Sequence, residues 1–534
     1  MTRRIFSAIA VATFVSLGAA AQSAADAYSL TPTQLRGSAR FVSMGGAFTS
    51  LGSDLSCMKQ NPAGLGLYRY SDLGLSFDIS IRNFKSQSNA AQYSDNKTPV
   101  IFDNFGYAGV FNLSNSGILR SIQWGFSYNR LSSFERRGTA YVNPTNSSLS
   151  NYVASFTNGT NSDLLLGSDN QSPYNNGTDW LSILAYNSLM ISNSSPGTNT
   201  EYVGLYQNGT HGDALYEVNQ RGYVDEYNID IAGNLDDVVY WGLGVGIYDV
   251  NFTQESNYSE SMSGAYIYDR STDAFATGNA GFNLYNLKTV TGSGANIKLG
   301  VIVRPVDQFR IGFAVHTPTW LHLTHRGYGY VDYNYTPDGS DKTDSDGTDT
   351  PDYDYRSRLN TPWRFMVGVS GTIAGQAIIS ADYERVDYAN MKMKQESGLY
   401  GSFQDNTLAN EDIRNYFKAA NIFRIGAELR LTNSFSVRAG YNWQGSSVKD
   451  VANSPSTAVA TSGTEPSYTF FEGTNNVSLG LGYRYKGWYV DLAWQYTRRK
   501  GTWHAYTNFN GIEAPTASLT HTHNNIVIST GLRF

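Results

Sequence analysis

Residues 525–534 read Asn-Ile-Val-Ile-Ser-Thr-Gly-Leu-Arg-Phe, and their side chains alternate in character. The even positions are mainly apolar and end in Phe534, whereas the odd positions include Asn525, Ser529 and Arg533. A repeat of two residues is the repeat of a β-strand, because successive side chains point to opposite faces. The stretch therefore predicts a strand with one apolar face, suited to lipid, and one polar face, suited to the lumen of a barrel.

The same alternation recurs throughout the chain. It is found in residues 73–82, 122–129, 223–232, 241–248, 297–304, 309–316, 363–373, 423–431, 435–444 and 488–497. The sequence is rich in aromatic residues, with 38 Tyr, 26 Phe and 9 Trp, and only 16% of its residues are charged. Large aromatics on one side of so many strands favour a membrane barrel over a soluble sandwich or propeller.

Short and long connections alternate between these strands. The short ones are residues 114–117, 234–237, 305–308, 374–376, 432–434 and 486–487. The long ones are residues 85–97, 143–216, 260–278, 337–356, 401–412, 446–472 and 505–519. The pattern predicts an all-β fold, a transmembrane antiparallel up-and-down barrel of about 14 strands over residues 70–534. Short turns would face the periplasm and long loops the exterior, with 143–216 and 337–356 the most prominent.

The N-terminal residues predict export. Arg3 and Arg4 precede an apolar run over residues 5–17, which small residues follow. This is the pattern of a signal peptide over residues 1–21, with the cut between Ala21 and Ala27. We therefore expect the outer membrane of a Gram-negative cell, with the mature N-terminus in the periplasm.

Residues 22–69 do not alternate, and they are rich in turn-forming residues. They include the pair Gly45-Gly46 and the run Asn61-Pro62-Ala63-Gly64. Such a segment is expected to be compact and turn-rich. Because an open barrel of this strand number would be a water channel, we expect the segment to fold into the lumen as a hatch.

Two stretches of this segment resemble a known family. Residues 38–48 read Ser-Ala-Arg-Phe-Val-Ser-Met-Gly-Gly-Ala-Phe and residues 61–65 read Asn-Pro-Ala-Gly-Leu. They are similar to the N-terminal hatch of the FadL/TodX family of outer-membrane transport proteins, most of all to the branch found in Bacteroidetes. The resemblance implies a hatch-plugged barrel of 14 strands that passively carries hydrophobic compounds such as long-chain fatty acids or aromatic hydrocarbons. The insertion 143–216 departs from the better-known fatty-acid members, which leaves the ligand open.

The resemblance also implies a kink in the third strand through which ligand leaves sideways into the bilayer. The alternation falters at Asn129, Leu131, Ser132 and Ser133, so these residues are the candidates for such a lateral opening. An ordinary bulge is the alternative.

Charged residues fall on lumen-facing positions of several strands. The main ones are Arg304, Arg310, Glu428, Arg430, Arg438 and Asp491. Our hypothesis is a charge ring that holds the hatch through Arg36, Arg40, Asp54 and Lys59. The alternative is the ordinary polarity of a barrel lumen.

Other functions find less support. A general porin or a structural or adhesive surface barrel is the main alternative, and haem uptake is a minor one. No Ser, His and carboxylate set predicts an enzyme. We expect no cofactor and no metal site, because the Asp-rich run 338–354 lacks calcium-loop spacing. The histidines, including His521 and His523, are expected at the membrane interface or in loops.

The expected partners follow from the same class of protein. They are a hydrophobic small-molecule ligand, outer-membrane lipid and lipopolysaccharide, and the barrel-assembly machinery that reads a terminal aromatic such as Phe534. A net charge of −6 gives no footprint for nucleic acid. We expect a monomer.

Overall fold

A computed structural model describes residues 23–113, 117–167, 171–195, 197–397, 401–454 and 457–534. The predicted signal peptide and most of the turn predicted at 114–117 lie outside these ranges. Within them, no helix is long and apolar enough to span a bilayer.

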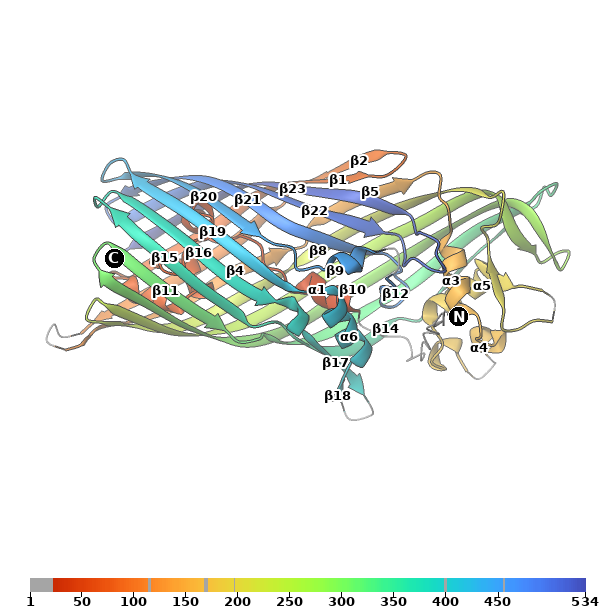
Figure 1. Ribbon diagram of the computed structural model, residues 1–534, viewed down its shortest axis with the longest axis horizontal. Helices are drawn as coiled ribbons and strands as arrows, with labels where there is room; N and C mark the ends of the chain where they lie inside the picture. The colour runs from red at the N-terminus through yellow and green to blue at the C-terminus, as the bar shows by residue number, and fades with distance from the viewer. Residues whose placement is uncertain (1–22, 114–116, 168–170, 196, 398–400, 455–456) are drawn as a thin grey trace, which may run out of the picture.

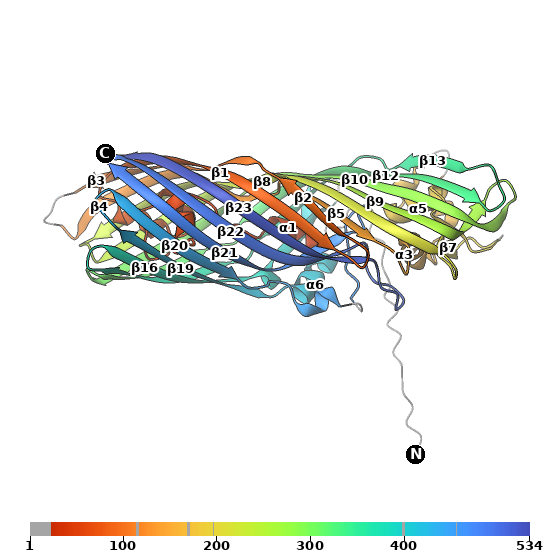
Figure 2. The same ribbon diagram turned by 90° about the horizontal axis from the view of Figure 1, so that it is seen from above.

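The fold is a closed barrel of 14 antiparallel strands, as the alternation predicted (Figures 1 and 2). In ring order the strands are β1 (Asp72–Gln87), β3 (Val100–Asn112), β4 (Leu119–Ser133), β8 (His211–Leu235), β9 (Val239–Asp269), β10 (Ala274–Val306), β11 (Phe309–His316), β15 (Arg364–Ile373), β16 (Ala377–Asp387), β19 (Ala419–Arg430), β20 (Phe435–Gln444), β21 (Tyr468–Tyr485), β22 (Trp488–His504) and β23 (Thr516–Arg533). The ring closes where β1 pairs with β23, with Asp72 opposite Arg533. We call the end with the short connections the turn end and the opposite end the loop end.

The outer face of the barrel carries an apolar band next to the turn end. On β9 the outward side chains Leu243, Val245 and Ile247 are exposed, and the next outward residues, Asp249 and Asn251, are polar. An outward apolar band bounded by polar residues is what a bilayer requires of a barrel. The change at Asp249 therefore marks the edge of the membrane on this strand.

Several strands continue far beyond this band. β9 and β10 have 31 and 33 residues, and only residues 270–273 connect them. The expectation of a long loop at 260–278 is therefore wrong, because these residues form the end of a hairpin. At about 3.3 Å a residue, such a strand is about 100 Å long, several times the height of a membrane band.

The neighbouring strands are extended in pieces. After a break at Thr317–Pro318, β11 continues as β12 (Trp320–Pro337), and the expected loop 337–356 contains β13 (Asp344–Asp349) and the start of β14 (Tyr353–Asn360). β14 in turn pairs with β17 (Lys392–Ser397), which pairs with β18 (Ser402–Asp405). Pro318 explains the break, because proline has no N–H for the ladder.

The insertion 143–216 folds into a cap at the loop end (Figure 1). It contains α3 (Leu149–Thr157), α4 (Ser162–Leu166), α5 (Trp180–Asn187), β6 (Ile191–Asn193), β7 (Tyr202–Gly204) and a 3-10 turn, η3 (Pro173–Asn175), before β8 begins. Leu149, Ile183 and Leu184 pack with Tyr335 and Trp503 of the extended strands in one apolar core. The insertion is thus a packed structure rather than an open loop.

The first described residues lie inside the barrel. They form α1 (Ala24–Leu30), α2 (Ala39–Ser43), η1 (Leu55–Lys59) and η2 (Pro62–Leu67), which precede β1 and appear within the wall of strands in Figure 1. Each of these helices has a polar side chain at its N-cap, namely Ser23, Ser38, Asp54 and Asn61. Such caps bind free helical N–H groups, which allows short helices to form without long runs of good helix formers. We call residues 23–69 the N-terminal segment.

Candidate functional site: a lumen cavity beside the N-terminal segment

Glycines on the inner wall let the N-terminal segment lie against the strands. A Cβ atom at Gly440 of β20 would lie 2.2 Å from the Gly45 nitrogen, and one at Gly242 of β9 would lie 2.3 Å from the Ala63 nitrogen. Both distances are too short for any side chain, so the close backbone approach depends on glycine at these positions. Gly45 and Gly46 themselves have φ values of 63° and 74°, in the left-handed region that glycine adopts without strain.

Replacing Gly440 with valine should loosen the segment. A bulky side chain in this contact is expected to cost about 1–3 kcal/mol, as overpacking does in cores. The measurement is the rate at which a protease cleaves the segment in the purified, folded barrel. The matched control is Gly371→Val, where an added Cβ would lie 3.7 Å from the Gln308 carbonyl oxygen, an ordinary contact. Equal cleavage of both variants would show that the contact does not hold the segment.

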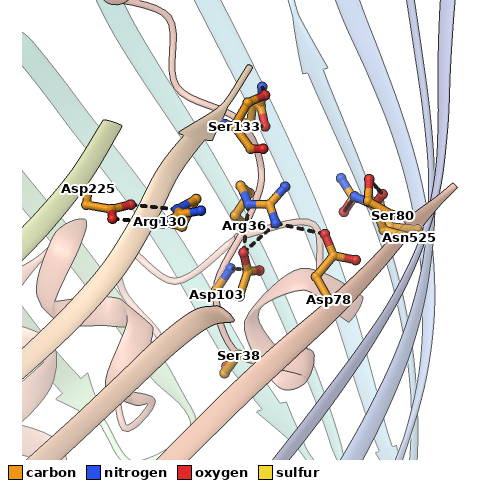
Figure 3. A network of polar contacts seen from close by, with 12 residues as sticks. Arg36, Ser38, Asp78, Ser80, Asp103, Arg130, Ser133, Asp225 and Asn525 are labelled. Atoms are coloured by element: carbon orange, nitrogen blue, oxygen red, sulfur yellow. Dashed lines mark hydrogen bonds and ion pairs between the residues drawn. The ribbon is translucent and has the colours of Figure 1, made fainter. Parts of the chain in front are cut away.

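Arg36 anchors the segment to the wall by a buried ion-pair network. Its Nε donates to Asp103 at 2.7 Å and its Nη2 to Asp78 at 2.8 Å, and the Gly37 N–H donates to Asp103 at 3.1 Å (Figure 3). The Arg36 and Asp78 side chains are 2% and 1% exposed. A bulge in β3 turns both Asp103 and Asn104 inward, which brings the Asp103 carboxylate to the segment.

A second network contains part of the expected charge ring. Arg40 donates to Glu428 at 2.8 Å, and Arg438 donates to Glu428 at 3.1 Å and to Asp491 at 2.6 Å. Arg310 donates to the Leu51 carbonyl oxygen at 3.3 Å. Four of the six ring residues thus belong to contacts with the segment or to the network behind them.

The other residues named with the ring take different places. Arg304 pairs with Asp307 beside a turn, and Arg430 is exposed at the end of β19. Their assignment to the ring is corrected, because both residues lie beyond the segment at the turn end. On the segment side, Asp54 accepts from Ser38 and Ser56, and Lys59 donates to the Arg36 carbonyl oxygen. Burial lowers the pKa of Lys59 to about 8.

Asn61 connects the segment to itself and to the wall. Its amide group donates to the Thr49 carbonyl oxygen at 2.5 Å and to that of Phe313 on β11 at 3.4 Å. Its side-chain oxygen accepts from the Ala63 N–H at 3.0 Å, which caps the 3-10 turn that starts at Pro62 and includes Gly64. The Asn-Pro-Ala-Gly run therefore forms a rigid turn against the strands.

The hydrogen-bonded wall is interrupted beside the third barrel strand. β4 has a register shift between Arg130 and Ser132, and Leu131 faces inward there. Asn129 is the last residue of β4 that pairs with β3. Beyond it, β2 (Gln92–Lys97) pairs with β1, and β5 (Arg136–Val142) pairs with β8. In the described residues no backbone ladder joins β2 to β5.

The N-terminal segment covers this interruption from inside. The Gln34 N–H donates to the Leu131 carbonyl oxygen at 2.9 Å, and the Ser132 hydroxyl donates to that of Pro32 at 2.8 Å. The Gln34 side chain also donates to the Ser133 carbonyl oxygen at 3.2 Å. The candidate kink residues are therefore bonded directly to the segment.

A cavity of about 340 Å³ lies between the segment, the interruption and the loop end. The segment lines it from Ser23 to Arg36, and the kink lines it with Leu131, Ser132 and Ser133. Apolar, basic and acidic side chains all line the cavity. The apolar ones include Leu131, Phe134, Val224, Phe252, Leu321, Val386 and Ile422, the basic ones include Arg82, Arg136, Arg499, His521 and His523, and the acidic ones include Asp26, Glu226, Glu384, Glu465 and Glu472.

The expectation for His521 and His523 is therefore wrong. They face the lumen and line the cavity, with their Nε2 atoms 3.0 Å apart. Both odd-numbered positions lie on the same face of β23 as Asn525, Ser529 and Arg533, so the alternation that assigns those residues to the lumen also applies to the two histidines. Among the described residues, no three His, Cys, Asp or Glu side chains gather as a metal site.

Helix α1 closes part of the cavity towards the loop end. Tyr28 stacks on Phe417 at 4.7 Å between ring centroids, just beyond α6 (Thr407–Tyr416). Asp26 forms an ion pair with Lys288 and accepts from Ser462 at 2.6 Å. Burial alone would raise the pKa of Asp26, but Lys288 and Ser462 lower it to about 2, so this carboxylate stays charged.

No protein-family model matches the chain, and no curated protein sequence does. Solved structures do match. The toluene transporter TbuX of Ralstonia pickettii has 15% identity over 94% of this chain and 99% of that one, with a TM-score of 0.44. The toluene transporter TodX of Pseudomonas putida has 12% identity over 95% and 100%, with a TM-score of 0.46. A FadL homologue of Pseudomonas aeruginosa has 12% identity over 97% and 99%, with a TM-score of 0.48.

The chain resembles transporters of the FadL/TodX family. This is the family to which residues 38–48 and 61–65 are similar. The narrower similarity to the branch found in Bacteroidetes stays a prediction. At these identities and TM-scores the matches carry no argument about the function.

Proposed function

We propose that this protein is a passive outer-membrane channel for hydrophobic compounds, with residues 22–69 as its hatch. The observation that carries the proposal is that one cavity borders the apolar side chains of the lumen, the N-terminal segment and the interrupted wall. A ligand bound there has the N-terminal segment on one side and, on another, the interruption, which begins along the ladder level with Tyr248, beside the membrane edge at Asp249. The proposed ligand classes are long-chain fatty acids and aromatic hydrocarbons.

Lateral exit is the proposed last step. When the segment moves, Gln34 releases the Leu131 carbonyl oxygen and Pro32 releases the Ser132 hydroxyl, which opens the wall beside the end of the β3–β4 ladder. An apolar ligand that leaves there passes into the bilayer and never returns to water, which avoids the cost of hydrating its surface. The turn end would face the periplasm and the loop end the exterior, where lipopolysaccharide is the neighbouring lipid. The exposed Phe534 at the turn end would serve barrel assembly.

Uptake by cells that lack or express the protein tests the proposal. We expect labelled oleate or labelled toluene to enter faster in expressing cells. The same protein in liposomes should not admit arabinose, because the segment fills the lumen. If arabinose enters as fast as through an open porin while neither labelled compound is accelerated, the general-porin alternative holds instead.

The structure also bears on the proposed signal cleavage. A cut after Ala21 keeps Ser23, which caps α1, and Asp26, which pairs with Lys288. A cut after Ala27 would remove both and leave Lys288 without this partner. We therefore expect the mature protein to begin at Gln22. Intact mass measurement of the purified barrel checks this, and a mass that corresponds to a start at Tyr28 would contradict it.

A further inference from the structure

Four strands bring five basic side chains to one side of the cavity. Arg82 of β1 lies directly opposite His523 of β23, and Arg499 of β22 lies directly opposite His521. Arg136, at the start of β5, is close enough to act electrostatically on His521 together with the other two arginines. Directly opposite side chains on antiparallel strands are neighbours, so the three arginines and the two histidines lie together. The three guanidinium groups are charged at neutral pH, and the cluster is therefore positive.

In the described residues, Asp78, Asp103 and Glu135 act electrostatically on Arg82 from beyond ion-pair distance. None of Arg82, Arg136 and Arg499 forms an ion pair within 4.0 Å in the described part of the chain, whereas Arg36, Arg40 and Arg438 each do. Arg82 is 2% exposed, and its Nη2 has no hydrogen-bond partner. The Nε atoms of Arg136 and Arg499 are likewise buried without a partner. Unsatisfied charged donors beside a cavity indicate a missing acceptor.

Aromatic rings hold the guanidinium groups in place. Arg499 lies over the Phe471 ring at 4.1 Å and Arg136 lies over the same ring at 5.4 Å. Arg136 also lies 5.3 Å from the centre of the Phe84 ring. Stacking on an aromatic face leaves the edge of a guanidinium group free, and that edge carries the donors that bind anionic oxygens in pairs.

Apolar side chains line the same cavity. Leu131, Val224, Phe252 and Leu321 are among them and belong to one apolar cluster. A molecule that satisfies both the basic and the apolar side chains must have an anionic head and an apolar tail. A cavity of about 340 Å³ is in the range of small-molecule sites.

We propose that the basic cluster binds the head of an amphiphile that carries more than one negative charge, with a phosphate monoester as the chemical class. The proposal rests on the proposed transport function and names its substrate class. A phosphate monoester carries a charge of about −1.5 to −2 at pH 7 and three acceptor oxygens. A carboxylate has one charge and two oxygens, which leaves part of a cluster of three arginines unsatisfied. A neutral hydrocarbon satisfies none of the three arginines.

Binding to the purified full-length barrel in a neutral detergent tests this. The probes share one chain length and differ in the head: dodecyl phosphate, dodecanoate and dodecanol, with inorganic phosphate as the head alone. We expect dodecyl phosphate to bind about tenfold more tightly than dodecanoate, since one charge-assisted contact is worth about that factor. Dodecanol and inorganic phosphate should both bind more weakly than dodecanoate.

Matched variants distinguish binding of a probe at the basic cluster from its uptake into detergent micelles. The double variant Arg136→Gln/Arg499→Gln should weaken dodecyl phosphate at least about tenfold and leave dodecanol unchanged. The control is Arg326→Gln, which removes an exposed arginine on β12 that pairs with Asp354 outside the lumen. A probe partitions into the detergent micelles to the same extent whichever protein variant is present. The ratio of the dissociation constants of two variants therefore reports binding at the site. Heat-dependent migration on gels confirms that each variant is folded.

The outcomes distinguish the two proposals. If dodecyl phosphate and dodecanoate bind equally tightly, the preference for a multiply charged head is overturned. If dodecanol binds as tightly as dodecyl phosphate, recognition of the head is overturned altogether. Both outcomes leave the proposed transport of hydrophobic compounds standing. Inorganic phosphate that binds as tightly as dodecyl phosphate overturns the amphiphile. If no chain-bearing probe binds, the proposed function falls together with this inference.

Discussion

Replacing Arg36 with methionine is expected to free the N-terminal segment and open the barrel to ions. The change leaves the buried Asp78 and Asp103 carboxylates without their shared cation, while the methionine keeps much of the volume. Breaking a buried ion pair from one side costs about 3–5 kcal/mol, most of which is the burden of the uncompensated charge. The measurement is single-channel conductance in a planar bilayer, which should rise from near zero to that of an open pore.

Two further variants show whether the effect comes from the buried charges. Adding Asp78→Asn and Asp103→Asn to Arg36→Met removes both orphaned charges and should restore low conductance in part. Arg326→Met removes an arginine from an exposed ion pair, which is worth about 0–1 kcal/mol, and should leave conductance unchanged. Conductance of Arg36→Met that stays at the wild-type value would show that this network does not hold the segment.

The barrel could be predicted because each membrane-crossing strand faces two different solvents. Lipid on one side and a polar lumen on the other impose a repeat of two residues, as on β23 and β22, and the turn residues mark the ends. The strand count and the turns at 234–237 and 486–487 follow directly from these local signals.

The extension of β9 and β10 could not be predicted by the same rule. Beyond Asp249 the outer face meets water, so Asn251, Asn257 and Ser259 give no apolar side to alternate with. The inner face is covered by helices of the insertion, whose apolar residues come from a distant part of the sequence. Polar stretches of this composition are typical of loops, and only tertiary packing turns them into strands.

The site was partly predictable for the same physical reason. Asn61-Pro62 and Gly45-Gly46 carry local turn chemistry that can be identified in a single segment. The basic cluster depends on register between β1, β22 and β23, which places Arg82, Arg499 and His521 together from positions hundreds of residues apart. The inward position of Asp103 depends on a bulge, and a bulge shifts the alternation by one residue without a clear mark in the sequence.

The contacts of the segment suggest how binding and release are coupled. Nine of the ten residues 25–34 line the cavity, and the same stretch includes Pro32 and Gln34, which bond to the interrupted wall at Ser132 and Leu131. The charged anchors at Arg36 and Arg40 follow directly along the chain. A ligand that displaces residues 25–34 can therefore uncover the interruption while the anchors keep the rest of the segment in the lumen.

Reversing the charge at Arg438 should release the other anchor of the segment. Arg438 is 1% exposed and lies between Glu428 and Asp491, and Glu428 also binds Arg40 of the segment. Arg438→Glu would place three carboxylates together and leave Arg40 and the more distant Arg484 to compensate them, at a cost of about 3–5 kcal/mol. We expect increased conductance and, in cells, increased sensitivity to a large hydrophilic antibiotic such as vancomycin. The matched control is Arg430→Glu, because Arg430 belongs to the same part of the barrel but is exposed beside a turn. If Arg430→Glu increased conductance as much as Arg438→Glu, general lumen charge rather than this anchor would control the leak.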